Sequence, residues 1–137
     1  PHMAVYALTS EYLAIGGTDR SADIKSCTLT VDVAQLDTTD MASGGWVEVI
    51  GGLKSGTLAV NWQDDLTDSA IDDDLWAILG TVVTFEVRGT SASVGANNPK
   101  YTGNVLISQH AIGGDVGSLA MKNTTWPTSG AITRAEA

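Results

Sequence analysis

The sequence predicts a mainly β fold, a β-sandwich or partly closed barrel with one short α-helix packed on its flank. Apolar and polar residues alternate in several stretches, glycine pairs separate these stretches, and only one stretch has its apolar residues at helical spacing. The chain of 137 residues has the length of one domain, with 15 glycines, 43% hydrophobic residues and 17% charged residues. This composition is typical of a turn-rich β domain and excludes a coiled coil or a charged disordered chain.

The first strands follow from strict alternation of apolar and polar residues. A short strand over 12–15 runs into a tight turn at Gly16-Gly17. The clearest strand covers 25–36, where apolar residues from Cys27 to Val33 occupy every second position. One face of this strand is therefore expected to be buried.

The next segment, 37–45, has few apolar residues and many turn formers, so we expect a mobile loop there. Alternation resumes over 46–50 and again over 55–63. We expect two successive antiparallel strands here, which flank a turn or bulge at Gly51-Gly52.

The helix is predicted to begin near Ser69 and to cover about 11 residues, a length that needs packing against a sheet for stability. Ser69 and Asp72 have the spacing of a capping box, and Gly80 supplies the stop. The apolar residues at helical spacing are Ile71, Leu75, Ile78 and Leu79.

The C-terminal half predicts a strand over 81–88 and a loop over 89–98. A long hairpin is expected from 101–112 and 115–126, joined at Gly113-Gly114. After a break at 127–130, the segment 131–134 could add a last short strand. We expect a single domain over 4–137, with Pro1-His2-Met3 as the remnant of an expression tag.

The charge balance argues against nucleic-acid binding. Seven Lys and Arg residues oppose 16 Asp and Glu residues, for a net charge of −9, and the cations are scattered singly along the chain. A protein that grips phosphates needs its cations clustered. Because no run of about 18 apolar residues occurs, no membrane span is expected either.

No catalytic, cofactor-binding or metal-ligating set is predicted, so we expect a protein that is not an enzyme. Cys27 stands alone and is expected to be a small buried apolar residue. His110 has no motif around it, and the phosphate-loop and dinucleotide glycine patterns are missing. No cofactor is implied.

Six carboxylates gather in the run 64–74. Clustered carboxylates suit calcium, but the calcium-loop pattern is absent, and acids in the first turn of a helix favour its N-terminal dipole. The four tryptophans could form a platform for a sugar, although Trp46, Trp62 and Trp76 are better explained by core packing. Trp126, which precedes a proline, is the open case.

Taken in order, five segments resemble the major tail protein, or tail tube protein, of long non-contractile-tailed bacteriophages. They combine an acidic loop, a Gly-Leu-Lys lead into a strand, an apolar helix, a Tyr-Thr-Gly strand start and a closing Thr-Arg. These segments are 36–41, 50–58, 75–80, 98–103 and 130–134.

The resemblance implies a structural virion protein whose subunits form rings, normally six-fold, that stack into a tube through which DNA passes without specific binding. It implies assembly in the host cytoplasm, and tape-measure, tail-tip and tail-terminator proteins as partners. The segment 37–45 matches the family's ring-stacking loop, which comprises Asp37, Thr38, Thr39, Asp40, Met41, Ala42, Ser43, Gly44 and Gly45. The segment 127–137 matches its C-terminal arm, with Ile132, Thr133 and Arg134 as the candidate contacts.

An acidic wall would keep DNA sliding, because like charges repel. Strand alternation makes Asp32, Glu48 and Glu86 the candidates for the channel or its rim, although each is equally explained as a solvated strand acid. Three other readings stay open: a carbohydrate-binding β-sandwich module, a tail-completion or baseplate adaptor, and a tube protein of a contractile injection system.

Overall fold

The computed structural model describes residues 5–67 and 70–137, and its only α-helix in these ranges is short. The strands are β1 (Tyr12–Ile15), β2 (Thr18–Asp19), β3 (Ile24–Asp37), β4 (Val49–Gln63), β5 (Val82–Arg88), β6 (Lys100–Leu106) and β7 (Met121–Ala135). The helix α1 covers Ile71–Ala77, and two short 3₁₀ turns cover Ser21–Asp23 and Met41–Ser43.

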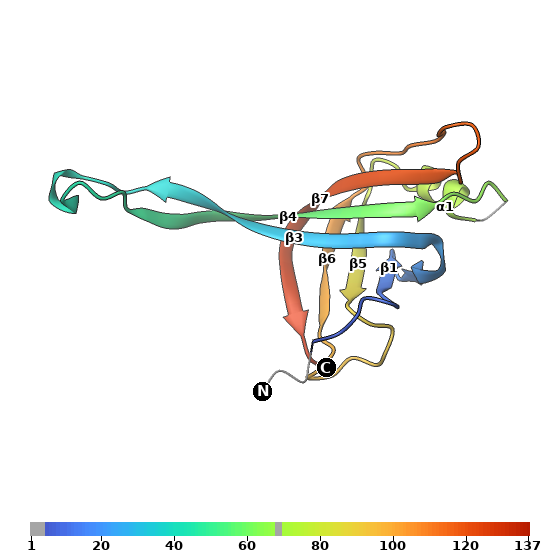
Figure 1. Cartoon of the computed structure of the whole chain (residues 1–137), viewed down its shortest axis with the longest axis horizontal. Helices are drawn as coiled ribbons and strands as arrows, with labels where there is room; N and C mark the ends of the chain where they lie inside the picture. The colour runs from blue at the N-terminus through green and yellow to red at the C-terminus, as the bar shows by residue number, and fades with distance from the viewer. Residues whose placement is uncertain (1–4, 68–69) are drawn as a thin grey trace.

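All strand pairs are antiparallel, in the order β2-β1-β5-β6-β7-β4-β3. Strand β7 bends: its first half pairs with β4 up to Thr57–Pro127, and its second half pairs with β6 from Val105–Thr128 onward. Figure 1 shows the two resulting layers, with β3, β4 and the start of β7 running across β1, β5 and β6. The predicted sandwich or open barrel with one short helix is confirmed.

The core lies between these layers. Trp62 and Trp126 are fully buried in it, with ring centroids 6.0 Å apart. The Trp62 indole N–H donates to the Thr124 hydroxyl at 2.9 Å, so the indole nitrogen is not left without a partner in the core. Helix α1 adds Ile71 and Leu75 to this cluster, as the helical spacing predicts.

Cys27 is buried, as expected. Burial, together with the nearby Glu11 carboxylate, raises the pKa of its thiol to about 12. This thiol is therefore unreactive at neutral pH.

Helix α1 is shorter than expected because it ends at Ala77, and Ile78 already has a non-helical backbone. Ala70 precedes the first turn and offers no side-chain cap, while the predicted cap Ser69 lies outside the described residues. Gly80 has the left-handed φ of +87° expected at a helix stop, and its N–H bonds to the carbonyl of Ile107.

Three expectations for the strands are wrong. The segments 46–50 and 55–63 are not two strands, because β4 runs unbroken from Val49 to Gln63 and contains a bulge between Gly51, which pairs with Gln35, and Lys54, which pairs with Val33. No hairpin forms at Gly113-Gly114: Lys100 pairs with Ala135, so a long irregular connection joins β6 to β7. The break over 127–130 is absent too, since Pro127 sits where β7 changes partner and its missing N–H is tolerated.

Candidate assembly surface

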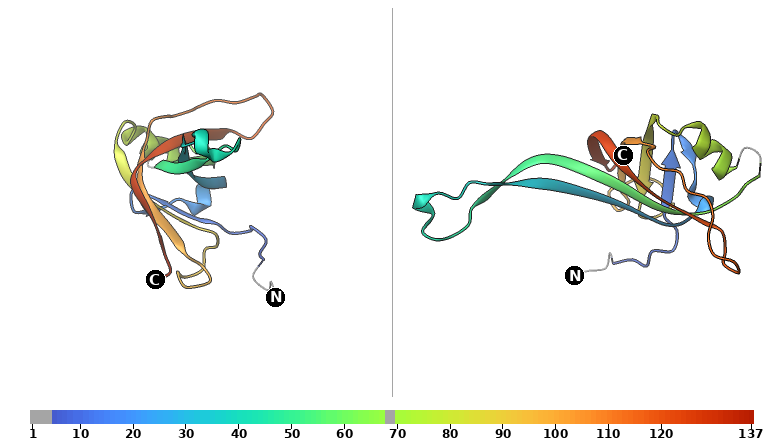
Figure 2. Two further views of the ribbon diagram at one scale, coloured as in Figure 1. Left: turned by 90° about the vertical axis from the view of Figure 1, so that its left-hand side faces the viewer. Right: turned by 90° about the horizontal axis from the view of Figure 1, so that it is seen from above.

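The outer parts of β3 and β4 form a long two-stranded ribbon that projects from the body. We call residues 31–55 the arm. Strand β7 reaches β4 only as far as Thr57, so beyond this point the arm has no third strand in the described chain. Figures 1 and 2 show the arm extending away from the body, at the opposite end from α1.

The arm exposes apolar side chains along its whole length. Leu53 is 86% exposed, Trp46 78% and Met41 fully exposed. The other exposed apolar residues of the arm are Val31, Val33, Leu36, Val47, Val49 and Ile50. A two-stranded ribbon is only marginally stable in water, and exposed apolar patches of this kind mark interaction sites.

The tip of the arm, 37–45, is built by local hydrogen bonds. Asp40 and Ser43 form a capping box around the short turn Met41–Ser43, which ends at Gly44 with a left-handed φ of +66°. Thr39 accepts a hydrogen bond from the Glu48 N–H at 2.8 Å, which ties the two strands together. Hydrogen bonds from the Thr39 hydroxyl and then from its backbone N–H lower the pKa of the Asp37 carboxyl.

The glycines next to the bulge in β4 leave room for side chains of β3. A Cβ on Gly51 would lie 3.2 Å from the Val33 side chain, and one on Gly52 equally close to Leu36. Small residues therefore let the apolar side chains of β3 lie across the ribbon.

At the root of the arm, Gly56 is buried. A Cβ there would lie 2.6 Å from Ile132 Cδ1 and 2.8 Å from Thr128 Oγ1. Ile132 and Thr128 belong to the second half of β7, so a side chain at position 56 would force these two side chains of β7 to move. A groove of about 430 Å³ borders this contact, lined by Val31, Lys54 and Ile132 among others.

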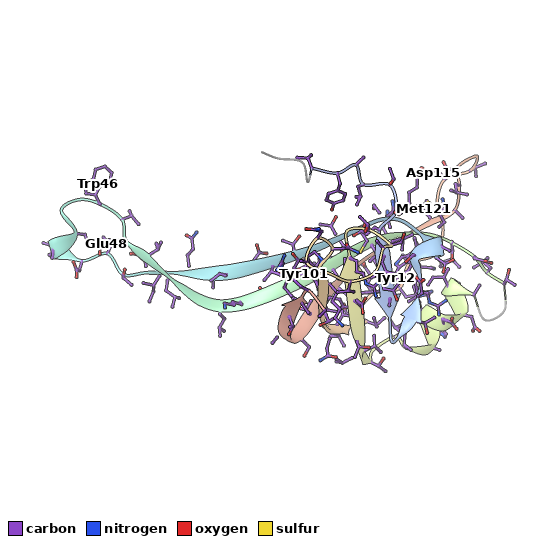
Figure 3. The ribbon with its side chains drawn as sticks, turned by 90° about the horizontal axis from the view of Figure 1, so that it is seen from below. Tyr12, Trp46, Glu48, Tyr101, Asp115 and Met121 are labelled. Carbon is purple, nitrogen blue, oxygen red and sulfur yellow. The ribbon has the colours of Figure 1, made fainter. Side chains whose placement is uncertain are left out.

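The three candidate channel acids do not come together in one chain. Asp32 lies on the arm opposite Ser55, and Glu48 lies at the base of the tip. Figure 3 shows Glu48 beside Trp46, far from Asp115 and Met121. Glu86 lies in the body, where it accepts a hydrogen bond from Arg88 at 2.6 Å.

The candidate contacts of the C-terminal arm are strand residues up to Ala135. Ile132 packs against the core, and Thr133 pairs with Thr102 of β6. The Arg134 guanidinium donates to the Tyr101 hydroxyl at 3.2 Å.

Several carboxylates of the acidic run 64–74 form ion pairs with basic side chains from other segments. Asp74 pairs with Arg20, and Asp64 and Asp72 both face Lys122. In the part of the chain that the structure describes, no three metal-ligating side chains gather into a site.

Lys122 is the residue that the sequence reasoning missed. Its side chain is fully buried although it carries an ammonium group. A signal existed, because strand alternation puts Lys122 on the same face as Thr124 and Trp126, which are both buried.

Two tryptophans differ from expectation: Trp46 and Trp76 are exposed, at 78% and 64%. Trp126, the open case, is fully buried and donates its indole N–H to the Gln109 carbonyl. It therefore offers no face to a sugar.

No family model and no curated protein matches this chain. Among solved structures, it is similar to a chain of the virion of a native gene transfer agent particle, with a TM-score of 0.70 and 19% identity over 90% of this chain and 95% of that one. It is also similar to a chain of the tail of an empty gene transfer agent particle refined with C6 symmetry, with a TM-score of 0.68 and 17% identity over 90% and 92%. The fold is thus one that also occurs in chains of a gene transfer agent virion and of a gene transfer agent tail.

Within residues 5–67 and 70–137, no helical segment has the length and hydropathy that a membrane-spanning helix requires.

Proposed function

We propose that this chain is a structural subunit of a phage-like tail tube, which assembles into stacked rings around a channel for DNA. The observation that carries the proposal is the arm, a two-stranded ribbon with an exposed apolar surface and no third strand among the described residues. Because such a ribbon needs further cover, a second copy of the chain is its natural partner.

In the proposed ring, neighbouring copies pair through the two edge strands of the sheet. Strand β3 is last in the strand order, and β2 stands at the opposite end. An exposed edge invites further pairing, and pairing β3 of one copy with the opposite edge of the next closes a ring without free edges. Since one similar tail was refined with C6 symmetry, six copies are the expected number.

The net charge of −9 suits a channel through which DNA slides, because like charges keep the two apart. Asp32, Glu48 and Glu86 stay our candidates for its wall or rim. Tape-measure, tail-tip and tail-terminator proteins are the proposed partners, and the virion tail is the proposed location.

Electron microscopy of concentrated protein tests the proposal, with tubes of even bore as the expected result. A variant that lacks residues 38–44 should fold, as judged by circular dichroism, but should not form tubes. Trp76→Ser, which removes an exposed tryptophan outside the arm, is the matched control and should still form tubes.

Tubes of normal length from the deletion variant would overturn the role given to the arm. Single rings that never stack would instead indicate a tail-completion or baseplate adaptor. A tube surrounded by a contractile sheath in the intact particle would indicate a contractile injection system. The carbohydrate-binding alternative loses its candidate residue, since Trp126 is buried.

A further inference from the structure

A group of four ionisable side chains lies at the end of the body opposite the arm, and two of them, Lys122 and Asp64, are buried. Asp64 follows β4, Asp72 belongs to α1, His110 lies between β6 and β7, and Lys122 belongs to β7. We call these four residues the Lys122 cluster. The proposed function uses none of them.

The Lys122 amine has two carboxylates within reach. Its Nζ lies 3.0 Å from Asp72 Oδ1 and 3.6 Å from Asp64 Oδ1, and it also donates to the Ala111 carbonyl. The side chain of Lys122 is fully buried and that of Asp64 is only 4% exposed. An amine and a carboxyl are thus held at close range where water is excluded.

The two carboxylates differ in their surroundings. Asp72 is held as the anion by Lys122 and by His110, whose Nε2 lies 3.3 Å away, and the hydrogen bond from Lys122 lowers its pKa. Asp64 Oδ1 is buried and has no hydrogen-bond partner in the described chain. A buried carboxylate oxygen without a hydrogen-bond partner is costly to keep in the folded state.

We propose that Lys122 and Asp64 condense into an intramolecular amide, an isopeptide bond between β7 and the end of β4. In a dry site the neutral amine and acid lie closer in energy to the ion pair than they do in water. The same exclusion of water removes the reagent that would hydrolyse the product.

The step balances with residues of this chain alone. Asp72 takes a proton from the Lys122 ammonium and gives it to an oxygen of Asp64, and the neutral Nζ then attacks Cγ of Asp64. Asp72 carries a second proton from the nitrogen to the departing oxygen. The Nζ–Cγ bond forms, one Cγ–O bond breaks, one water leaves, and Asp72 ends as the carboxylate it was at the start.

The strand register makes the link sterically reasonable. Trp62 pairs with Lys122, and the Asp64 N–H bonds to the Ala120 carbonyl, so Asp64 and Lys122 are diagonal neighbours on one face of paired strands. Closing the bond therefore requires a side-chain adjustment and no change of register.

Intact-mass spectrometry of the full chain, folded at neutral pH and then denatured, tests the proposal. The expected mass is that of the sequence less one water, and tandem spectra should show a branched peptide that joins positions 64 and 122. Lys122→Arg should keep the full sequence mass, whereas Lys100→Arg, which changes a lysine outside the cluster, should lose water like the wild type.

Two further variants examine the chemistry. Asp64→Asn should release ammonia and reach the mass of the wild-type product. Asp72→Asn, which cannot carry protons, should keep its full sequence mass while it folds.

A wild-type chain with its full sequence mass would overturn the proposal and leave the cluster as an ion network. A loss of water that persists in Lys122→Arg would overturn it too, because the dehydration would then lie elsewhere. An unchanged bond in Asp72→Asn would remove the role given to Asp72. None of these outcomes depends on whether the protein forms tubes.

Discussion

Gly56 is the position at which a single methyl group should reveal how the arm joins the body. In Gly56→Ala, the new Cβ would lie 2.6 Å from Ile132 Cδ1 and 2.8 Å from Thr128 Oγ1, well inside van der Waals contact. Both neighbours belong to β7 and must move together with it or change rotamer. Overpacking of this kind costs about 1–3 kcal/mol, so we expect the free energy of unfolding to fall by that amount.

Urea unfolding followed by tryptophan fluorescence measures this change, because Trp62 and Trp126 are buried in the native state. Gly95→Ala is the matched control: no heavy atom lies within 4 Å of its Cβ position and its φ is not left-handed. That variant should be unchanged or stabilised by about 0.4–1 kcal/mol through the unfolded chain.

A double variant locates the clash. Ile132→Val removes the closest atom and alone should cost about 0.5–1.5 kcal/mol. In the Gly56→Ala background it should cost less, because it also relieves the contact. If Gly56→Ala unfolds within about 0.5 kcal/mol of the wild type, which is the range of ordinary surface changes, the packing described at the root of the arm is not what requires glycine.

Two further predictions concern the core. Since burial raises the pKa of the Cys27 thiol from 9.0 to about 12, the unfolded chain releases this proton first, so stability should begin to fall above pH 9 and continue to fall up to about pH 12. Unfolding curves of Cys27→Ala should lack that part of the alkaline loss, and an identical pH profile would contradict the assignment. Trp62→Phe should cost about 1–3 kcal/mol because Thr124 loses its buried donor, and Thr124→Val in the same chain should recover part of the loss; no recovery would mean that the hydrogen bond contributes little.

Alternation of side chains predicted most strands because it reflects burial of one face. It located 25–36 and 81–88 well, since the inward residues of each pack on the same core. The alternation does not reveal that Val31 and Val33 are exposed. It shows that one face of a strand is apolar, but it does not show whether another part of the chain covers that face. The arm is therefore visible only in the pairing of β3 with β4 beyond the reach of β7.

The sequence also did not predict which segments pair with each other or in which register. The sequence around Gly113-Gly114 has hairpin chemistry, but β6 pairs with the far half of β7, a choice made by contacts distant along the chain. A proline interrupts a strand where its missing N–H would have to donate a hydrogen bond to a neighbouring strand. Pro127 lies where β7 changes partner from β4 to β6, so the strand continues through it. The resemblance predicted a mainly β, tail-tube-like fold, and chains of gene transfer agent particles share the fold observed here.

The stacking role of 37–45 and the channel role of Asp32, Glu48 and Glu86 stay predictions. The turn formers of 37–45 do mark the end of the arm, where β3 stops at Asp37 and a short 3₁₀ turn follows. The Lys122 cluster was not foreseen, because its members come from four segments and only the fold brings them together.

The bend of β7 has a mechanical consequence. Because one continuous strand is hydrogen-bonded to β4 in its first half and to β6 in its second, the two layers cannot separate unless one of these two ladders breaks. A force applied along the arm enters through β4 and is shared by both layers at once, loading many hydrogen bonds in parallel. Such a domain should yield abruptly and as a whole when stretched from the arm.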